Sequence, residues 1–431
     1  MRSFRRISRP AHVPALDLRA GTQPADGWLA FAAVTSALTI VTVGVNMPPV
    51  LFPRYVDAYG LSPFTVTGIF ATYTLCIAPA LLVFGPLSDA IGRKRVLVIA
   101  IVIAVAAAVV LAAARNVWWL FAGRALQGLA VGATQGSAAA ALADTHLRSD
   151  IAQAALAATL ATCVGTAVGP MCVGVLAQYG PAPLQLSYLV ELALLLAALA
   201  GLLAGFPAAR KTHGRHVKIR WPSVPANILP TFLRAGGSAV LAWVVAALFL
   251  ALAPSLLRTY LHTNNSVVSG GVQALMLTCS ALAQLGGRRR QTRPLQIFGL
   301  IVLVAGLGIL ASAAWATSAV LCALAAAVAG AGHGLVFSGS ARVVGAIAPS
   351  DRRGNIMSMF FVAIYLGVTV AVVGVGALSS GVGLTLAVQL FSLVVGLACA
   401  VSVVSHARQA PRTERAASRR AAGTRNGELD T

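Results

Sequence analysis

Twelve apolar stretches, separated by short charged or proline-containing segments, constrain the fold of this chain more than any other feature. Most are roughly 20 residues long, the length that an α-helix needs to cross the hydrocarbon core of a bilayer. Hydrophobic residues make up 58% of the sequence and charged residues only 10%, whereas about a quarter of the residues in soluble domains are charged. The chain is therefore predicted to be an all-α polytopic membrane protein. The predicted spans are 28–51, 64–84, 96–114, 117–140, 151–178, 184–206, 236–257, 268–286, 295–314, 318–341, 355–378 and 382–404.

The basic residues indicate how these spans are oriented. The chain has 32 Lys and Arg against 11 Asp and Glu, a net charge of +21 that would indicate a nucleic-acid partner in a soluble protein. With twelve spans, 28 of the 32 basic residues fall on the side of the two termini, three fall on the other side, and Arg124 lies within a span. Because basic residues are enriched on the cytoplasmic side, we expect a multi-pass protein of the cell's inner (plasma) membrane, with both termini cytoplasmic and no bound nucleic acid.

The longest internal hydrophilic segment divides the spans into two sets of six. A weak repeat relates the sets, since Gln127-Gly128-Leu129 of span four aligns with His333-Gly334-Leu335 of span ten. The basic start resembles a secretory signal, but the first apolar run continues past roughly 20 residues without a small-residue cleavage site, so we expect a retained span. The predicted organisation is a basic cytoplasmic tail (1–27), a six-helix bundle (28–206), a basic cytoplasmic linker (207–235), a second six-helix bundle (236–405) and a disordered cytoplasmic tail (406–431).

Cofactor chemistry has no signature in this sequence. All six cysteines lie inside apolar runs, without a CxxC pair or a histidine at ligand spacing, which favours packing roles over disulfides or a metal site. A GxxxxGK nucleotide-binding loop does not occur either. We therefore expect no metal and no cofactor, and an ion gradient instead of ATP as the energy source.

The segment GPLSDAIGRKRVL concentrates charge and glycine between the second and third spans. Gly85 would permit close helix approach, and Gly92 would permit a turn with positive φ. A carboxylate such as Asp89 is favoured at a helix N-terminus. Arg93 and Lys94 would hold the loop on the cytoplasmic side. The alternative is a short basic loop that does nothing more than determine topology.

This segment resembles the signature loop of the major facilitator superfamily, with the pattern G-x-L-a-D-r-x-G-r-R/K, although Ala90 stands where the family usually has a basic residue. The segment FAGRALQGLAVGATQG in span four resembles the family's R-x-x-q-G-x-g pattern. The resemblance implies two pseudo-symmetric six-helix bundles that open alternately to the two sides, with the loop as a conformational switch. It also implies a transporter instead of an enzyme, and we expect a monomer.

Arg124 is the first candidate for a functional residue inside a span. It shares one helical face with Gly128, Gly132 and Gly136, because these residues recur every fourth position. A guanidinium in hydrocarbon is expensive and is normally functional or paired. The family resemblance implies a role in proton coupling. The alternative is a structural tie between Arg124 and neighbouring backbone carbonyls.

Span five carries a third motif, TCVGTAVGPMCVGV. Gly165, Gly169, Pro170 and Gly174 match the G-x-x-x-G-P-x-x-G-G pattern found chiefly in antiporter branches of the family, including the drug–proton antiporters, while Val173 replaces one glycine. The proline would kink the helix, and the glycines would let it pack tightly against a partner from the other half. General small-residue packing is the alternative. This motif is the main reason to expect export.

Two further ionisable residues lie in spans. Glu191 has about the same predicted depth as Arg124, so the two would either pair or leave Glu191 to bind a proton or cation during transport. Alternatively, Glu191 reaches the outer interface. His333 is a third candidate for proton coupling, because imidazole titrates near physiological pH, and a histidine packed against glycines is its alternative. Asn46, Tyr73 and Gln127 are candidate cavity residues that ordinary interhelical hydrogen bonds would explain equally well.

In the second half, the segment AQLGGRRRQTRPL keeps a glycine and three arginines of the signature loop but lacks its carboxylate. We expect proton-coupled export of a small organic molecule by alternating access, with proton symport or facilitated uptake as the second reading. A membrane enzyme acting on lipid would need paired carboxylates or an HExxH motif on a span, and the sequence has neither. A sensor that kept the fold is a further alternative.

Overall fold

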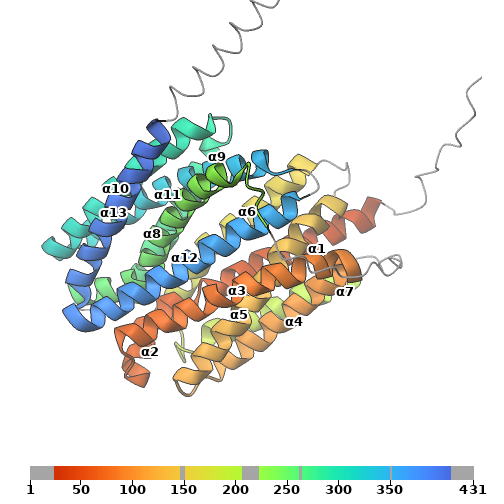
Figure 1. Cartoon of the computed structure of the whole chain (residues 1–431). Coiled ribbons are helices and arrows are strands. Elements are labelled where there is room, and N and C mark those ends of the chain that lie inside the picture. The colour runs from red at the N-terminus through yellow and green to blue at the C-terminus, as the bar shows by residue number, and fades with distance from the viewer. Residues whose placement is uncertain (1–23, 146–150, 206–222, 262–264, 350–351, 409–431) are drawn as a thin grey trace, which may run out of the picture.

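A computed structural model describes residues 24–145, 151–205, 223–261, 265–349 and 352–408, which form thirteen α-helices and no strand (Figure 1). The helices are α1 (Pro24–Val45), α2 (Pro48–Tyr59), α3 (Pro63–Ile91), α4 (Arg93–Ala112), α5 (Val117–Thr145), α6 (Ile151–Tyr179), α7 (Leu186–Gly205), α8 (Leu229–Leu261), α9 (Ser266–Gly287), α10 (Thr292–Ala316), α11 (Ala319–Ile347), α12 (Arg353–Val382) and α13 (Leu384–Ala407).

Eleven candidate membrane spans are long and apolar enough to cross a bilayer within the described residues, with α1 and α2 counted together as one. Helix α5 is not among them, because Arg124 and two glutamines lower its hydropathy. It is nevertheless 29 residues long and packs along α3 and α4, inside the bundle, so it is the twelfth span. The predicted all-α fold with twelve membrane-spanning helices is confirmed.

The two halves, α1–α7 and α8–α13, pair their helices in the same way. In the first half α5 packs on α3 and α4, and in the second half α11 packs on α9 and α10. Helix α4 likewise packs on α7, as α10 packs on α13. Between the halves, α6 packs on α9 and α3 packs on α12. These repeated pairs make the two halves pseudo-symmetric. Figure 1 shows the halves side by side, with α12 next to α3.

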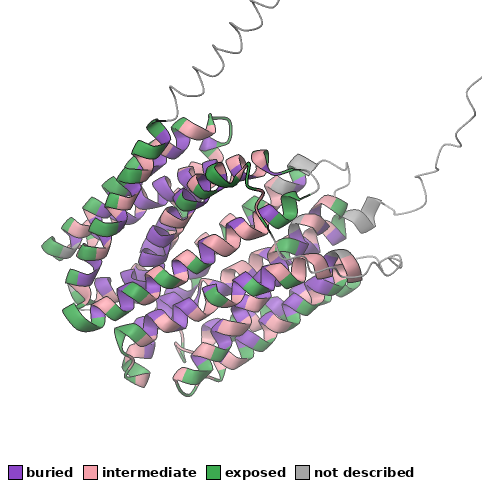
Figure 2. Ribbon diagram, in the orientation of Figure 1, coloured by how far each residue is buried: buried purple, intermediate pink, exposed green. Residues whose placement is uncertain are grey.

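Burial follows this arrangement (Figure 2). Among the eleven candidate spans, α8 is the most enclosed, because 78% of the residues in its apolar stretch are buried. In α13 only 28% are buried. Large apolar side chains on the outside remain exposed, such as Val320, Val370 and Val401. An exterior of this kind is suited to lipid and not to water.

Three differences from the predicted helix boundaries change the organisation of the chain. Span one is broken at Asn46 and Met47, between α1 and α2. The predicted linker 207–235 is too long, because α8 begins at Leu229. The prediction of a charged loop between spans two and three is wrong, because α3 continues to Ile91 and only Gly92 separates it from α4.

Local chemistry explains several helix ends. Gly92 has φ +97°, as predicted for a turn that only glycine adopts without strain. The side chains of Ser62, Asn265 and Ser318 accept hydrogen bonds from backbone N–H groups at the starts of α3, α9 and α11. Residues 1–23, 206–222 and 409–431, which hold most of the predicted tails and linker, lie outside the described residues.

The helices alternate in direction, which defines two ends of the molecule. We call the end where α1 begins and α13 ends the termini side, and the end where α2 and α8 end the distal side. Polar contacts between the halves gather on the distal side. Arg258 of α8 forms a 2.7 Å ion pair with Asp57 of α2, and Arg54 of α2 donates to the Ser266 hydroxyl of α9 at 3.0 Å.

Candidate functional site: a central cavity beside a broken helix

A cavity of about 350 Å³ lies between the two halves. Its described walls come from α1, α2, α3, α5 and α6 on one side and from α8, α9, α11 and α12 on the other. Within the described part of the chain, α4, α7, α10 and α13 contribute no lining residue. The cavity extends toward the termini side as far as Gln284, which lies in the last turn of α9. Its size falls in the range of small-molecule sites.

The two walls differ in chemistry. The first half contributes five threonines and Asn46 beside apolar residues, Tyr73 and Arg124, and hydroxyls such as that of Thr162 bond to carbonyls of their own helix. The second half contributes four aromatic rings, namely Trp243, Phe337, Phe361 and Tyr365. These rings contact one another edge-on, tilted or stacked, with centroids 5.6–6.5 Å apart. The cavity therefore has one mixed wall that carries hydroxyls and Arg124, and one wall with a cluster of aromatic rings, the aromatic wall.

The break between α1 and α2 lies at the edge of this cavity. Proline lacks a backbone N–H, so Pro48 and Pro49 leave the carbonyls four residues earlier, Gly44 and Val45, without their α-helical donors. The backbone N–H of Met47 replaces the donor for Gly44, at 3.2 Å, but no backbone N–H in the described turns donates to Val45. Buried carbonyls without donors are costly. The sequence Asn46-Met47-Pro48-Pro49 thus creates a local need for side-chain donors inside the membrane.

Arg124 and Gln127 of α5 meet this need. Arg124 Nη1 donates to the Val45 carbonyl at 3.0 Å and to Gln127 Oε1 at 2.8 Å, and Gln127 Nε2 donates to the Gly44 carbonyl at 3.0 Å. The structural tie considered for Arg124 is confirmed. Gln127, a candidate cavity residue, is instead buried behind the wall, whereas Asn46 and Tyr73 line the cavity as expected.

The guanidinium of Arg124 keeps unused donors. The residue is 1% exposed and lies at the cavity wall, with its Cζ 4.2 Å from the centroid of the Tyr73 ring. Its Nε and Nη2 atoms are buried and have no hydrogen-bond partner among the described residues. A buried cation with free donors needs a compensating negative charge.

Glu191 of α7 comes to the same break from behind the cavity. Its carboxyl group packs against the Cα of Gly44, where any side chain would overlap it. The residue is 2% exposed, and Oε2 has no hydrogen-bond partner in the described part of the structure. Arg124 and Glu191 are close enough to interact electrostatically, although they form no ion pair within 4.0 Å in the described ranges. Glu191 therefore lies inside the bundle and not at the interface.

His333 of α11 faces the aromatic wall. Its Nδ1 lies 2.7 Å from the hydroxyl of Ser280, and its ring meets Trp243 edge-on at 4.9 Å. Both His333 Nε2 and Trp243 Nε1 are buried without a partner among the residues described. His333 lines the cavity, which keeps it a candidate, and its packing against Ser280 also fits the alternative of a structural histidine.

The glycines of α6 serve two different contacts. A Cβ at Gly165 or Gly169 would lie 2.7 Å from a carbonyl oxygen of α1, in the same half. A Cβ at Gly174 would lie 2.7 Å from the Ser266 carbonyl of α9, in the other half, and Gly270 of α9 packs in turn on Pro170. The predicted close approach to the other half is therefore correct for Gly174 but wrong for Gly165 and Gly169.

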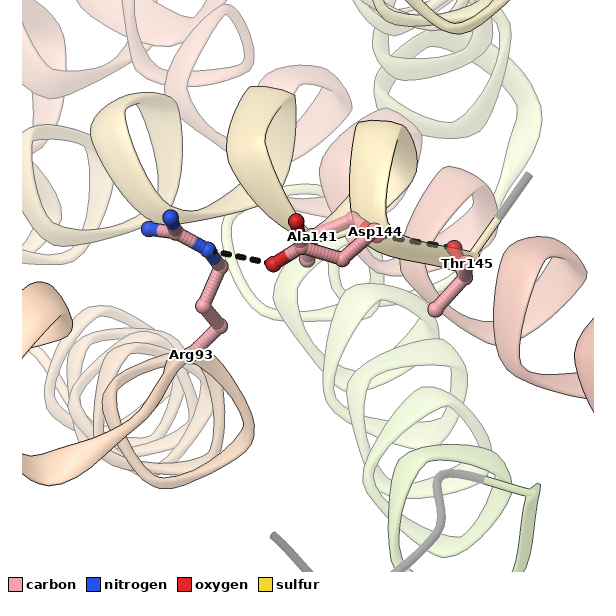
Figure 3. A network of polar contacts seen from close by, with 4 residues as sticks. All are labelled: Arg93, Ala141, Asp144 and Thr145. Atoms are coloured by element: carbon pink, nitrogen blue, oxygen red, sulfur yellow. Dashed lines mark hydrogen bonds and ion pairs between the residues drawn. The ribbon is translucent and has the colours of Figure 1, made fainter. Parts of the chain in front are cut away.

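The basic residues after Gly92 tie helix ends together on the termini side. Arg93 Nε forms a 2.6 Å ion pair with Asp144 Oδ2 at the end of α5 (Figure 3), and Lys94 Nζ donates to the Leu203 carbonyl of α7 at 3.2 Å. Asp89 falls in the last turn of α3, and its side chain lies outside the described part of the structure. The Cα of Gly85 lies 3.8 Å from a Cβ placed at Gly136 of α5, so α3 and α5 approach each other here, but a Cβ placed at Gly85 itself would meet nothing within 4 Å.

Sequence reasoning missed the aromatic wall. Trp243 and Tyr365 occur in apolar runs that look the same as lipid-facing ones. Tyr365 of α12 and Gln135 of α5 line the same cavity from the two halves. A clustering of aromatic residues at Phe360, Phe361 and Tyr365 was the one available signal.

The fold and cavity define a polytopic protein built from two similar six-helix halves around a central site, the architecture of a secondary transporter. Residues 29–321 match the sequence model of the Major Facilitator Superfamily, and the chain belongs to this family. No curated protein sequence matches it significantly.

Solved transporters share the fold at low sequence identity. A bacterial homologue of the human lysosomal transporter Spinster, inward-facing and occupied, has a TM-score of 0.71 at 14% identity and covers 90% of this chain and 98% of its own. A D-xylose–proton symporter has a TM-score of 0.69 at 14% identity, covering 87% and 96%. A mutant of the nucleoside transporter NupG has a TM-score of 0.63 at 12% identity, covering 89% and 100%.

Proposed function

We propose that this protein carries a small organic molecule across the cell's plasma membrane by alternating access, coupled to protons, with export as the leading direction. The cavity between the halves carries the proposal, because rocking of two similar halves about such a site exposes it to each side in turn. The distribution of basic residues supports cytoplasmic termini, so that the distal side would be extracellular. The α6 motif supports export, and uptake by symport is the second candidate because a D-xylose–proton symporter shares the fold.

The experiment is flux into proteoliposomes that contain the purified full chain, with a pH gradient of either sign and a panel of small organic compounds. Accumulation driven by an acidic interior supports exchange with protons. Accumulation driven by an acidic exterior supports symport instead. If an imposed gradient changes the flux of no compound, coupling to protons is wrong.

Glu191 is the proposed proton carrier, since it is the one Asp or Glu in the middle of a described span and it contacts the helix break. The segment from Gly85 to Lys94 is proposed as the conformational switch. Replacing Glu191 with Gln keeps the shape of the side chain, but glutamine cannot exchange a proton. The flux should therefore lose its dependence on pH while the protein stays folded. Glu428→Gln, the same substitution near the C-terminus of the sequence, is the control. Unchanged pH dependence in the Glu191 variant would remove this residue from the mechanism.

A further inference from the structure

The charge on the cavity wall indicates the class of molecule that binds. No Asp or Glu lines the cavity within the described part of the chain, and Arg124 is its only charged lining residue. The one carboxyl group nearby, Glu191, is behind the wall against Gly44. An organic cation would lose its hydration beside the positive charge of Arg124, which costs several kcal/mol. Cation–π contacts with the aromatic wall would return only about 0.5–2 kcal/mol of this.

The guanidinium of Arg124 is prepared for an anion. Nη1 is held by the Val45 carbonyl and Gln127, and the Tyr73 ring covers one face of the group. The unused donors, on Nε and Nη2, lie in the guanidinium plane, the direction in which carboxylates and phosphates bind as bidentate partners. Because the side chain is already ordered, a ligand would lose little further side-chain entropy on binding.

The opposite wall indicates what the remainder of the ligand, apart from its acidic group, would be. Trp243, Phe337 and Tyr365 form an aromatic surface, and the buried N–H of Trp243 together with Nε2 of His333 adds two unpartnered polar positions among the described residues. This surface fits a flat apolar body. The cavity of about 350 Å³ limits the size of that body to a small molecule.

We propose that the cavity selects an amphipathic organic anion, with its single acidic group on Arg124 and its apolar body against the aromatic wall of α8, α11 and α12. This inference rests on the proposed transport function and names its substrate class. It also makes Glu191 a competitor, because a negative charge near Arg124 weakens the binding of a second one.

The test uses the purified full chain and matched sets of probes that differ in one group: 1-naphthoate, the neutral 1-naphthamide and the cationic 1-naphthylmethylammonium, with 1-naphthalenesulfonate as a second acid. Quenching of tryptophan fluorescence and ligand-induced thermal stabilisation report binding. We expect the acids to bind about 10- to 100-fold more tightly than the amide, the gain typical of hydrogen bonds to a charged group, and the cation to bind most weakly. A carboxylate and a sulfonate that bind equally would mean that charge and not shape is recognised.

Variants locate the selectivity. Arg124→Gln should abolish the preference for acids, Arg124→Lys should retain it at lower affinity, and Glu191→Gln should bind acids more tightly than the wild type. Arg115→Gln, an exposed arginine outside the cavity, is the matched control. The proposal is overturned if the amine or amide binds as well as the acids, if no acid binds, or if Arg124→Gln keeps the preference.

Flux measurements separate this inference from the proposed transport function. If acids bind but no compound crosses the membrane, the anion site stands and transport fails. If amines are transported and acids are not, transport stands and the anion site is wrong. Should Arg124→Gln fail to fold, the selectivity of the wild type and of Arg124→Lys still decides the question.

Discussion

In the N-terminal half, α1 stops ahead of two prolines, and Arg124 and Gln127 satisfy the freed carbonyls. In the C-terminal half, α8 continues through Pro254, and Gln273 Nε2 donates to the carbonyl of Leu250, which this proline frees, over 3.4 Å. The same helix pairing thus supports a charged, broken helix in one half and a neutral, continuous helix in the other. The two halves therefore share their backbone packing, whereas the buried charged residues of the described helices, Arg124 and Glu191, lie in the N-terminal half.

The termini side shows a similar contrast. Arg93 pairs with a carboxylate, Asp144, in the first half. In the second half, Arg342 at the end of α11 donates to the backbone carbonyls of Gly287, Arg288 and Arg290. Lys94 and Arg293 nevertheless act alike, since each donates to carbonyls at the end of the last helix of its half. The end of α11 is therefore joined to the α9–α10 junction by hydrogen bonds to backbone carbonyls, where the first half uses an ion pair between α4 and α5.

The largest effect is expected where both halves share close packing. A Cβ at Gly128 would lie 2.5 Å from the Tyr73 carbonyl, and one at Gly334 would overlap the Ser280 carbonyl. Gly128→Val and Gly334→Val should each lower the free energy of unfolding by about 3 kcal/mol or more, because backbone cannot move aside cheaply. Thermal inactivation of the purified protein measures this. Gly237→Val, where nothing lies within 4 Å, is the control. If only one of the two variants lost stability, the two halves would not share this close packing.

The next effect should separate the halves. Arg124→Leu leaves the Val45 carbonyl without its side-chain donor and should destabilise the protein by about 1–3 kcal/mol. Gln273→Leu removes one long hydrogen bond and should cost at most about 1 kcal/mol. Thermal stability in the same detergent compares the two variants. Equal losses of stability would mean that losing the donor to a proline-freed carbonyl costs the same whether or not the helix is broken there.

Arg342→Gln should lower stability by about 1–2 kcal/mol, because three carbonyls lose a charged donor that is only partly exposed. Carbonyls carry no net charge, so raising the salt concentration should hardly change the difference from wild type. Thermal unfolding at low and high salt is the measurement. A loss that disappears in high salt would contradict the hydrogen-bonding role.

Asp144→Asn should have the smallest effect on stability, about 0.2–1 kcal/mol, because the side chains of Arg93 and Asp144 are 30% and 60% exposed. Here the difference should shrink as salt rises. Replacing Asp144 with Glu keeps the charge and serves as the control. A larger loss of stability that does not depend on salt would mean that hydrogen bonding, and not charge attraction, holds the helix ends in both halves.

Some features were predictable because they are local. Gly92 separates two apolar runs and only glycine adopts its backbone conformation easily, so its turn could be read from a few residues. The end of α1 is a contrasting case. Pro48 and Pro49 begin α2, but the predicted span continued through them, because a proline near a helix start and one that ends a helix look alike in sequence.

The side-chain assignments needed the tertiary structure. The carbonyl that Arg124 binds lies 79 residues away in the chain, and Tyr365 and Gln135 belong to one site only because α12 and α5 line the same cavity. Gly165 and Gly174 share one motif yet contact different halves, since residues nine apart on a helix point in different directions.

The sequence by itself determined the membrane class, the number of spans, the two-part organisation and the family, because hydropathy and glycine spacing act within one or two helical turns. The tertiary structure alone decided that Arg124 and Gln127 satisfy a broken helix, that Glu191 lies behind the wall and that aromatic rings form the opposite wall. These facts depend on which helix faces meet, and an apolar residue facing lipid has the same hydropathy as one facing a cavity.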